Sequence, residues 1–301
     1  MPTSRLRCNT CGGEVPIPSH ESPLVSDLKC RACCALFPLR DGIIEVTATT
    51  REEDYPEAFV QLVADVQDKH FWFAARNDII VSTMRRTVGP LAGKSALEIG
   101  CGTGAVLPAL EGAGMSVCGI DMHRSALLHA RGRVRGPLVW TNATALPFFD
   151  DFDVVLLCDV IEHADDDVGL LVEAGRAMKP GGWLVVTVPA QPHLWTRYDE
   201  VIGHKRRYTP KLLAMKLTAA GFVRPQIRYF NMVTALVQQL HRRRSDRRNK
   251  SQEAMTIVCE ALRVPPYPMN LMLRLMARAE APLSRFAQLK GSSLVAAATR
   301  D

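Results

Sequence analysis

A chain of 301 residues, 47% hydrophobic and 23% charged, has a globular composition and enough length for one sizeable core and a smaller domain. No stretch approaches the roughly 20 uncharged apolar residues of a membrane span, and the first ten residues lack the apolar region of a signal peptide, which predicts a cytoplasmic protein. The net charge of +6 is modest and partly local, because His241 to Lys250 holds six Lys or Arg, and it does not by itself imply nucleic acid.

Cysteines cluster at the start of the chain, where five of the nine fall within the first 34 residues. Four of them form two C-x2-C pairs separated by 18 residues, and these are Cys8, Cys11, Cys30 and Cys33. Two thiolate pairs at this spacing can grip one tetrahedral zinc ion, and a reducing compartment favours ligation over disulfides. Four thiolates leave no open position, so we expect a structural zinc in a ribbon over residues 1–47. Cys34 breaks the register and is the poorer candidate.

A helical linker or lid is predicted next, over residues 48–92. Apolar residues recur at helical spacing from Phe59 to Val66 and from Ile79 to Met84, with an aromatic run, HFWF, between them.

Strands and helices alternate beyond residue 93. Seven apolar runs read as strands, and they are Ser95–Gly100, Met115–Ile120, Leu138–Trp140, Asp153–Cys158, Trp183–Val188, Gln226–Phe230 and Ser293–Arg300. Helical segments between them start near Thr103, Arg124 and Asp166. This rhythm predicts a Rossmann-like α/β domain over 93–301, with a mostly parallel seven-stranded sheet, helices on both faces, and ligands at the carboxyl ends of the strands.

A helical insertion over 231–290 separates the last two predicted strands. Toward its C-terminal end, an apolar face is formed by Met272, Leu275, Met276, Ala279 and Leu283. The opposite face carries Arg274, Arg278 and Arg285. We expect a helix that caps the core with its apolar face; a helix that lies on a membrane surface or covers the substrate is the open alternative.

The segment ALEIGCGTG places three glycines at the turn after the first strand of this domain, where the backbone can approach a nucleotide-like ligand. Such a turn fits NAD and S-adenosylmethionine (SAM) alike. Glu98 would repel the pyrophosphate of NAD and suits the cationic amino acid portion of SAM. Asp121, at the end of the second strand, can accept both ribose hydroxyls, and Asn142 after the third can bind the adenine edge.

The stretches LEIGCGTG, GIDMHRSAL, NATALPFFDDFDVVLLCDVIEHADD and MKPGGWLVVTVP resemble the class I SAM-dependent methyltransferases, in particular the group with the quinone-biosynthesis and many small-molecule enzymes. The resemblance runs from about His70 to the end of the chain. It implies SAM contacts at Glu98, Gly100, Gly102, Asp121, Met122, Asn142, Ala143 and Cys158. That group usually has Asp where this chain has Asn142, whose oxygen can still accept from the adenine amino group.

Two further resemblances extend this interpretation. HFWFAARN and LWTRYDEVIGHKRRYTP resemble members that act on small or lipid-linked molecules, where these segments close over the methyl donor. The likeness implies that Arg76 pairs with the SAM carboxylate, against the alternative of a solvated helix arginine. CRACCALFPLRDGI is similar to the zinc-ribbon activator subunits that partner tRNA and release-factor methyltransferases, here fused to the catalytic chain.

A hydroxyl or phenol acceptor needs a general base, and the candidates near the strand ends are His163, His204 and Tyr208. For both histidines a structural role in a loop is the alternative. Lys205, Arg206 and Arg207 are expected either to meet an acidic substrate or to form a solvated loop face.

These features predict methyl transfer to a small molecule, at an oxygen, in specialised (natural product) or lipid-linked metabolism. The rival is an RNA or protein methyltransferase that holds its polymer with the ribbon and the basic loop; a non-catalytic scaffold is the third interpretation. The fourth strand ends in Cys158-Asp159-Val160-Ile161 instead of the Asn-Pro-Pro-aromatic turn of enzymes that methylate nucleobases or glutamine amides, which argues against a nucleic acid partner. Peripheral membrane contact and the oligomeric state stay open.

Overall fold

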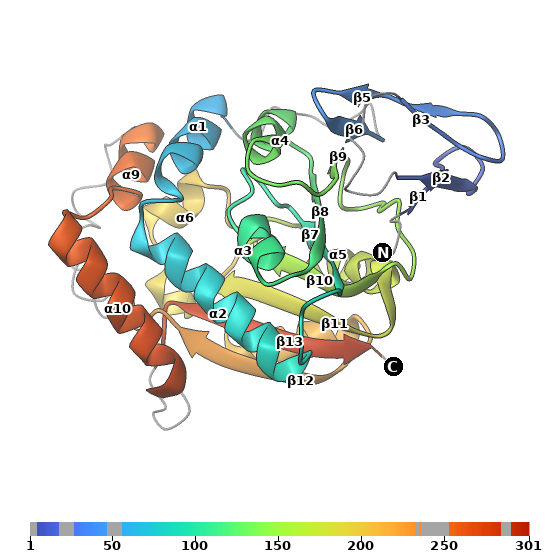
Figure 1. The fold of residues 1–301 in the computed structure, drawn as a ribbon. Helices are drawn as coiled ribbons and strands as arrows, with labels where there is room; N and C mark the ends of the chain where they lie inside the picture. Colours follow the sequence, from blue (N-terminus) through green and yellow to red (C-terminus); the bar gives the residue numbers. More distant parts are fainter. Residues whose placement is uncertain are drawn as a thin grey trace.

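The computed structural model describes residues 5–17, 27–46, 56–232, 235, 253–283 and 290–300. They fold around one twisted nine-stranded sheet (Figure 1). Across the sheet the strands are β12 (Phe222–Phe230), β13 (Ser293–Arg300), β11 (Met178–Pro189), β10 (Phe152–Cys158), β7 (Ser95–Ile99), β8 (Ser116–Asp121), β9 (Leu138–Trp140), β6 (Ile43–Glu45) and β5 (Leu39–Arg40). Pairing is parallel from β11 to β6, whereas β13 is antiparallel to both of its neighbours and β5 to β6. The predicted α/β fold with a mostly parallel sheet is therefore confirmed.

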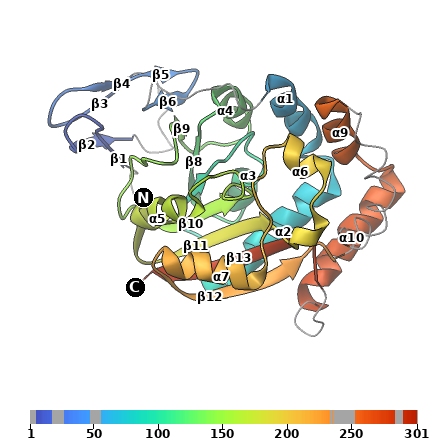
Figure 2. The same ribbon diagram turned by 180° about the vertical axis from the view of Figure 1, so that it is seen from behind.

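Helices cover both faces of the sheet, as predicted (Figures 1 and 2). They are α1 (Glu57–Val66), α2 (Phe71–Thr87), α3 (Leu107–Gly112), α4 (Arg124–Arg131), α5 (Asp167–Ala177), α6 (Arg197–Val201), α7 (Pro210–Ala219), α9 (Ala254–Ala261) and α10 (Tyr267–Leu283), with a short 3-10 turn, η2 (Pro192–Leu194). Strand β10 shows why helices must cover both faces of the sheet, because its apolar side chains point to both sides. Val154 and Leu156 pack with α2, α3 and α4, whereas Val155 and Leu157 pack with α5 and α7. An unbroken apolar strand of this kind is buried on both sides.

The N-terminal segment forms two small hairpins and an extension of the main sheet. Strand β1 (Arg5–Arg7) pairs with β2 (Glu14–Pro16), and β3 (Leu28–Lys29) pairs with β4 (Leu36–Phe37). The next two strands, β5 and β6, join the sheet at β9, with Ile44 opposite Val139. The seven predicted strands thus become nine, because the end of the segment predicted as a separate ribbon belongs to the central sheet. The predicted domain boundaries themselves stay predictions.

The helical insertion supplies α9 and α10, while His241 to Lys250 and Arg285 lie outside the described residues. Helix α10 lies beside α2 (Figure 1): Asn270 accepts from the Phe71 amide at 3.0 Å, and the Arg278 Nε lies 2.6 Å from Asp78. The expectation that its apolar face caps the core is wrong, since Met272, Leu275 and Met276 are 41–55% exposed.

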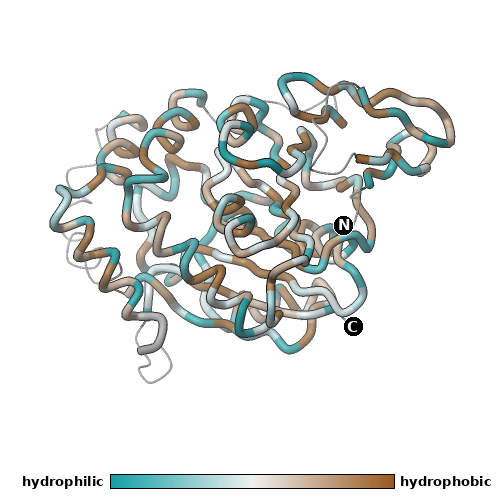
Figure 3. The backbone as a smooth tube through the Cα atoms, in the orientation of Figure 1, coloured by the Kyte–Doolittle hydropathy of each residue, from teal (hydrophilic) through white to brown (hydrophobic). Residues whose placement is uncertain are grey.

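Hydropathy along the backbone follows the same plan. Hydrophobic residues concentrate in the central strands, and hydrophobic segments also occur along α10, at the edge of the molecule (Figure 3). Within the stretches of chain that the structure describes, the helices are too short or too polar to cross a bilayer.

Candidate functional site

The glycine turn after β7 is built from three residues with positive φ, at +70° for Gly100, +52° for Gly102 and +74° for Gly104. A Cβ on Gly100 would lie 2.7 Å from a methyl of Val160, and one on Gly104 would lie 3.0 Å from the Ala130 Cβ, so internal packing requires both glycines. At Gly102 a Cβ would meet nothing within 4 Å. This turn therefore leaves room above Gly102, where a ligand can approach the backbone.

Asp121 ties this turn to the end of β8. Its carboxylate accepts from the Gly102 amide and the His123 amide, both at 2.8 Å, and the residue is buried. Burial raises the pKa of this carboxyl, although both amide bonds favour the ionised form. A carboxylate has four lone pairs, so the group can still accept from ligand hydroxyls in addition to these amides.

Glu98 is the second acid of the site. It is 2% exposed, and its Oε2 has no hydrogen-bond partner among the described residues. Burial raises its pKa to about 8, opposed by the charge of Arg76 and a hydrogen bond from the Cys158 thiol. Cys158 ends β10, and burial raises its pKa as well, so it is a protonated thiol. A buried acceptor without a partner is a site where a cationic ligand group would be stabilised.

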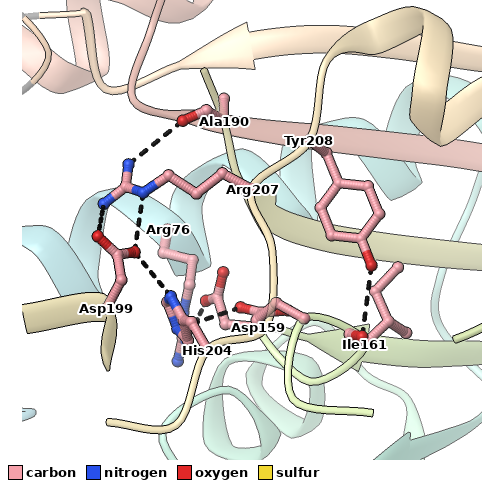
Figure 4. A network of polar contacts seen from close by, with 9 residues as sticks. Arg76, Asp159, Ile161, Ala190, Asp199, His204, Arg207 and Tyr208 are labelled. Atoms are coloured by element: carbon pink, nitrogen blue, oxygen red, sulfur yellow. Dashed lines mark hydrogen bonds and ion pairs between the residues drawn. The ribbon is translucent and has the colours of Figure 1, made fainter. Parts of the chain in front are cut away.

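Arg76 reaches this region from α2. It is 7% exposed and donates to the Asp159 Oδ2 at 2.8 Å (Figure 4). Its guanidinium lies over the rings of Trp72 and Phe73, at 4.9 Å and 5.5 Å from their centroids. The alternative of a solvated helix arginine is therefore wrong. Its predicted role toward the SAM carboxylate stays a prediction, since in this structure its partner is Asp159.

The residues predicted to contact adenine lie at the carboxyl ends of β8 and β9. The Trp140 Nε1 donates to the Met122 carbonyl at 2.9 Å, which fixes the two strand ends to each other. The Asn142 Oδ1 accepts from the Thr144 amide at 3.0 Å and so closes a tight turn. Asn142 and Ala143 are both half-buried in this turn. Since that oxygen already has one partner, its second lone pair and the amide Nδ2 are what Asn142 can offer to a ligand.

The structure brings the two candidate base histidines together. The rings of His163 and His204 lie 4.8 Å apart at 73°, and the His204 Nδ1 lies 2.8 Å from the Asp199 Oδ1. Asp199 in turn accepts from the Arg207 Nε and Nη2, at 2.8 Å and 2.9 Å (Figure 4). Burial, with the neighbouring imidazole of His204, lowers the pKa of His163 to about 4. His163 is therefore neutral near pH 7.

The structure does not bring Tyr208 to this site. The side chain is fully buried, and its hydroxyl donates to the Asp167 Oδ2 at 2.9 Å. The same oxygen lies 3.3 Å from the Ile161 carbonyl, and the ring points away from His204 (Figure 4). Burial and the adjacent Asp167 carboxylate raise its pKa. A phenol held in the core with a raised pKa is poorly placed to act as a general base, so the structure favours a structural role for Tyr208.

Tyr208→Phe tests this structural role. We expect the free energy of unfolding to fall by about 1–3 kcal/mol, because the buried Asp167 loses a hydrogen-bond donor. Urea denaturation followed by fluorescence measures it, and Tyr267→Phe is the matched control, since Tyr267 is 79% exposed. Unchanged stability in Tyr208→Phe would contradict the assignment.

The basic loop is neutralised from within the chain. Lys205 pairs with Asp165, Arg206 lies 2.8 Å from Asp167, and Arg207 is buried against Asp199. All three cations that were expected to meet an acidic substrate thus have acidic partners within the chain. Sequence reasoning missed two acids beside the two candidate histidines, Glu162 and Asp199. The only local signal was that Glu162 directly precedes His163 and that Asp199 lies five residues before His204.

The four cysteines of the N-terminal segment converge, as their spacing predicts. All four sulfur atoms lie within 4.8 Å of one another, and the Cys8–Cys33 and Cys11–Cys30 pairs are each separated by 3.6 Å. Four sulfurs about 2.3 Å from one tetrahedral ion would be about 3.8 Å apart, so the cluster has the right size for zinc. Cys34 lies outside this cluster.

Comparison with known proteins agrees with this geometry. Residues 97–186 match the methyltransferase domain family. The ubiquinone biosynthesis O-methyltransferase of Thiobacillus denitrificans is 38% identical over 105 residues, which cover 33% of this chain and 45% of that protein. The chain thus spans less than half the length of this relative.

Solved structures show the same fold. A phosphoethanolamine N-methyltransferase 2 from Haemonchus contortus has a TM-score of 0.55 at 18% identity, over 85% of this chain and 62% of that one. A chain of the complex with the Haloferax volcanii Trm112 methyltransferase activator has a TM-score of 0.53 at 19% identity, over 83% of this chain and 99% of that one. The family match and the Thiobacillus relative, with which the strand order and the glycine turn agree, identify residues 97–186 as a class I SAM-dependent methyltransferase domain.

Proposed function

We propose that this chain transfers a methyl group from SAM to an oxygen atom of a small molecule, in specialised or lipid-linked metabolism. The observation that carries the proposal is the set of groups around the open turn: the free space above Gly102, the Asp121 carboxylate beside it, and the buried Glu98 Oε2 without a partner. The name of the Thiobacillus relative supports an oxygen acceptor and a quinone-like class of substrate.

The residues present fit SAM. Asp121 would accept the ribose hydroxyls, and Glu98 would receive the ammonium of the methionine portion. Arg76 would turn from Asp159 to the methionine carboxylate. SAM supplies a methyl group that its sulfonium already activates, so the protein's work is to orient the acceptor and exclude water.

The acceptor hydroxyl must lose a proton as it is methylated. The side chains available for this step are the paired histidines at the carboxyl end of β10, His163 and His204, with Glu162 beside them. Asp199 orients the His204 ring through Nδ1 and leaves Nε2 free.

A structural zinc ion in the cysteine cluster belongs to the same proposal. Cys8, Cys11, Cys30 and Cys33 would hold it as four thiolates, and its role would be to stabilise the hairpins that share an apolar cluster with β6 and β9.

Two measurements test the proposed function. In calorimetric titrations SAM should bind and NAD should not. In an extract incubated with tritiated SAM and the enzyme, label should enter the solvent-extractable small molecules and not the acid-precipitable RNA and protein. Label found mainly in the precipitate would replace this proposal with the macromolecular alternative.

Proton release on SAM binding is a separate prediction. The Glu98 carboxyl, with a pKa of about 8, is mostly protonated at pH 7 in the free protein, and an ammonium partner would lower that pKa. Binding should therefore release up to about 0.9 of a proton at pH 7 and almost none at pH 9. Calorimetry in buffers of different ionisation enthalpy measures this release, and Glu98→Gln should abolish it. Equal release from that variant would contradict the assignment.

A further inference from the structure

Glu162 is the buried acid that the glycine-turn site does not use. It is fully buried, and neither carboxylate oxygen has a hydrogen-bond partner among the described residues. The nearest cationic candidate is the His204 Nε2, at 3.8 Å from Oε1. A carboxylate removed from water this completely costs several kcal/mol unless a cation compensates it. Without a cation beside it such a group stays protonated, so a bound cation is what would let Glu162 ionise here.

His204 is oriented as a metal-binding histidine would be. Its Nδ1 is held by Asp199, which also accepts from Arg207 and from the backbone and hydroxyl of Thr196. With Nδ1–H donated to a carboxylate, Nε2 carries the free lone pair, and this is the nitrogen that faces Glu162. Metal-ligating histidines are typically fixed in this way by a carboxylate on their other nitrogen.

His163 supplies a third donor next to Glu162 in the chain. One ligand atom each from Glu162, His163 and His204 lies within 4.8 Å of the other two. Small side-chain rotations would bring all three to the roughly 2.1 Å that nitrogen and oxygen ligands keep from such ions. We propose that these three residues bind one divalent transition-metal ion, which receives the oxygen of the methyl acceptor.

The donor set selects the class of metal. Two imidazole nitrogens and one carboxylate oxygen suit manganese, iron, cobalt or zinc, whereas magnesium and calcium prefer oxygen ligands alone. Three protein ligands leave positions open, in contrast to the closed cysteine cluster. An acceptor with two neighbouring oxygen atoms could fill two of these open positions.

The role of the ion rests on the proposed function. Bound to the cation, the acceptor hydroxyl would release its proton to solvent more readily. The oxygen would then attack the methyl carbon, forming the O–C bond as the C–S bond breaks and its electron pair stays on sulfur. The Arg76–Asp159 pair interacts electrostatically with both Glu98 and Glu162, so the cofactor site and the proposed metal site adjoin each other. In this arrangement the histidines are ligands and not general bases.

Manganese binding to the full chain tests the site without SAM or acceptor. Free Mn²⁺ is followed by its electron paramagnetic resonance signal, because manganese has little affinity for a four-thiolate cluster. We expect one ion per chain in the wild type and at least a 100-fold loss of affinity in Glu162→Gln and His204→Ala. His193→Ala, which removes an exposed histidine, should bind as the wild type does.

Thermal unfolding provides a second readout. Without metal, Glu162→Gln should melt at a higher temperature than the wild type, because it removes an unpaired buried acid, and added Mn²⁺ should stabilise only the wild type. No Mn²⁺ bound at about 1 mM, or equal binding by the wild type and both site variants, would overturn the proposal.

The two proposals fail separately. If metal binds but methylation is unchanged after chelation, the acceptor role is wrong while the metal site and the methyltransferase stand. If the chain neither binds SAM nor transfers methyl groups, the proposed function is wrong, and the manganese titration still decides the metal site.

Discussion

Asp121→Ala is expected to weaken SAM binding by at least about 100-fold. The carboxylate would lose two charge-assisted hydrogen bonds to the ribose, each contributing about 1.5–3 kcal/mol, and tenfold in affinity corresponds to about 1.4 kcal/mol. The same change leaves the amides of Gly102 and His123 without their acceptor, so the glycine turn also loses the group that positions it. Calorimetric titration with SAM measures the effect.

The matched control is Asp78→Ala. Asp78 is an exposed acid of α2 whose ion pair with Arg278 lies on the surface, so its loss should change SAM affinity by less than about twofold. Melting temperatures of both variants separate a binding defect from unfolding. SAM affinity within tenfold of the wild type in a folded Asp121→Ala protein would mean that the ribose is held elsewhere, and the proposed cofactor site would have to be redrawn.

Loss of the cysteine cluster is expected to give the largest structural effect. In the double variant Cys30→Ser, Cys33→Ser, zinc content should fall to none, and the hairpins should unfold because a structural zinc ion contributes most of the stability of such small segments. Strands β5 and β6 would then detach from β9, and the melting temperature should fall by at least about 5 °C.

The same double variant should bind SAM about tenfold more weakly than the wild type. The hairpins support the loop expected to hold adenine: the Arg7 amide donates to the Pro147 carbonyl at 2.7 Å, and the Val46 amide donates to the Trp140 carbonyl at 3.2 Å. Cys34→Ser is the control, since that exposed thiol lies outside the cluster. A double variant with normal melting and normal SAM affinity would show that the hairpins are independent of the sheet.

Sequence alone was sufficient where the signal is local. The β7 and β10 strands follow from short, mostly apolar runs, the turn from three glycines, and the cysteine cluster from its spacing. Strands β5 and β6 could not be predicted as members of the sheet, because segments of two or three residues carry too little periodicity and their partner, β9, is distant in sequence.

The errors share one physical origin. Which face of an amphipathic helix is buried depends on what it packs against, and α10 docks on α2 through Asn270 and Arg278, leaving Met272 exposed. Tyr208 similarly looked available because a hydroxyl is polar, whereas its ring fills the core and its oxygen has a buried partner. Glu162 carried no separate signal, since only the fold brings it near His204.

The continuity of β6 with β9 has a consequence for how the ribbon is kept in place. Since both partners belong to one chain, their association is intramolecular, with an effective concentration on the order of millimolar. Dilution therefore cannot dissociate the N-terminal ribbon from the methyltransferase domain, as it could dissociate a separate activator subunit. Oxidation or metal starvation, which act on the thiolates directly, are the conditions under which the edge of the sheet would open.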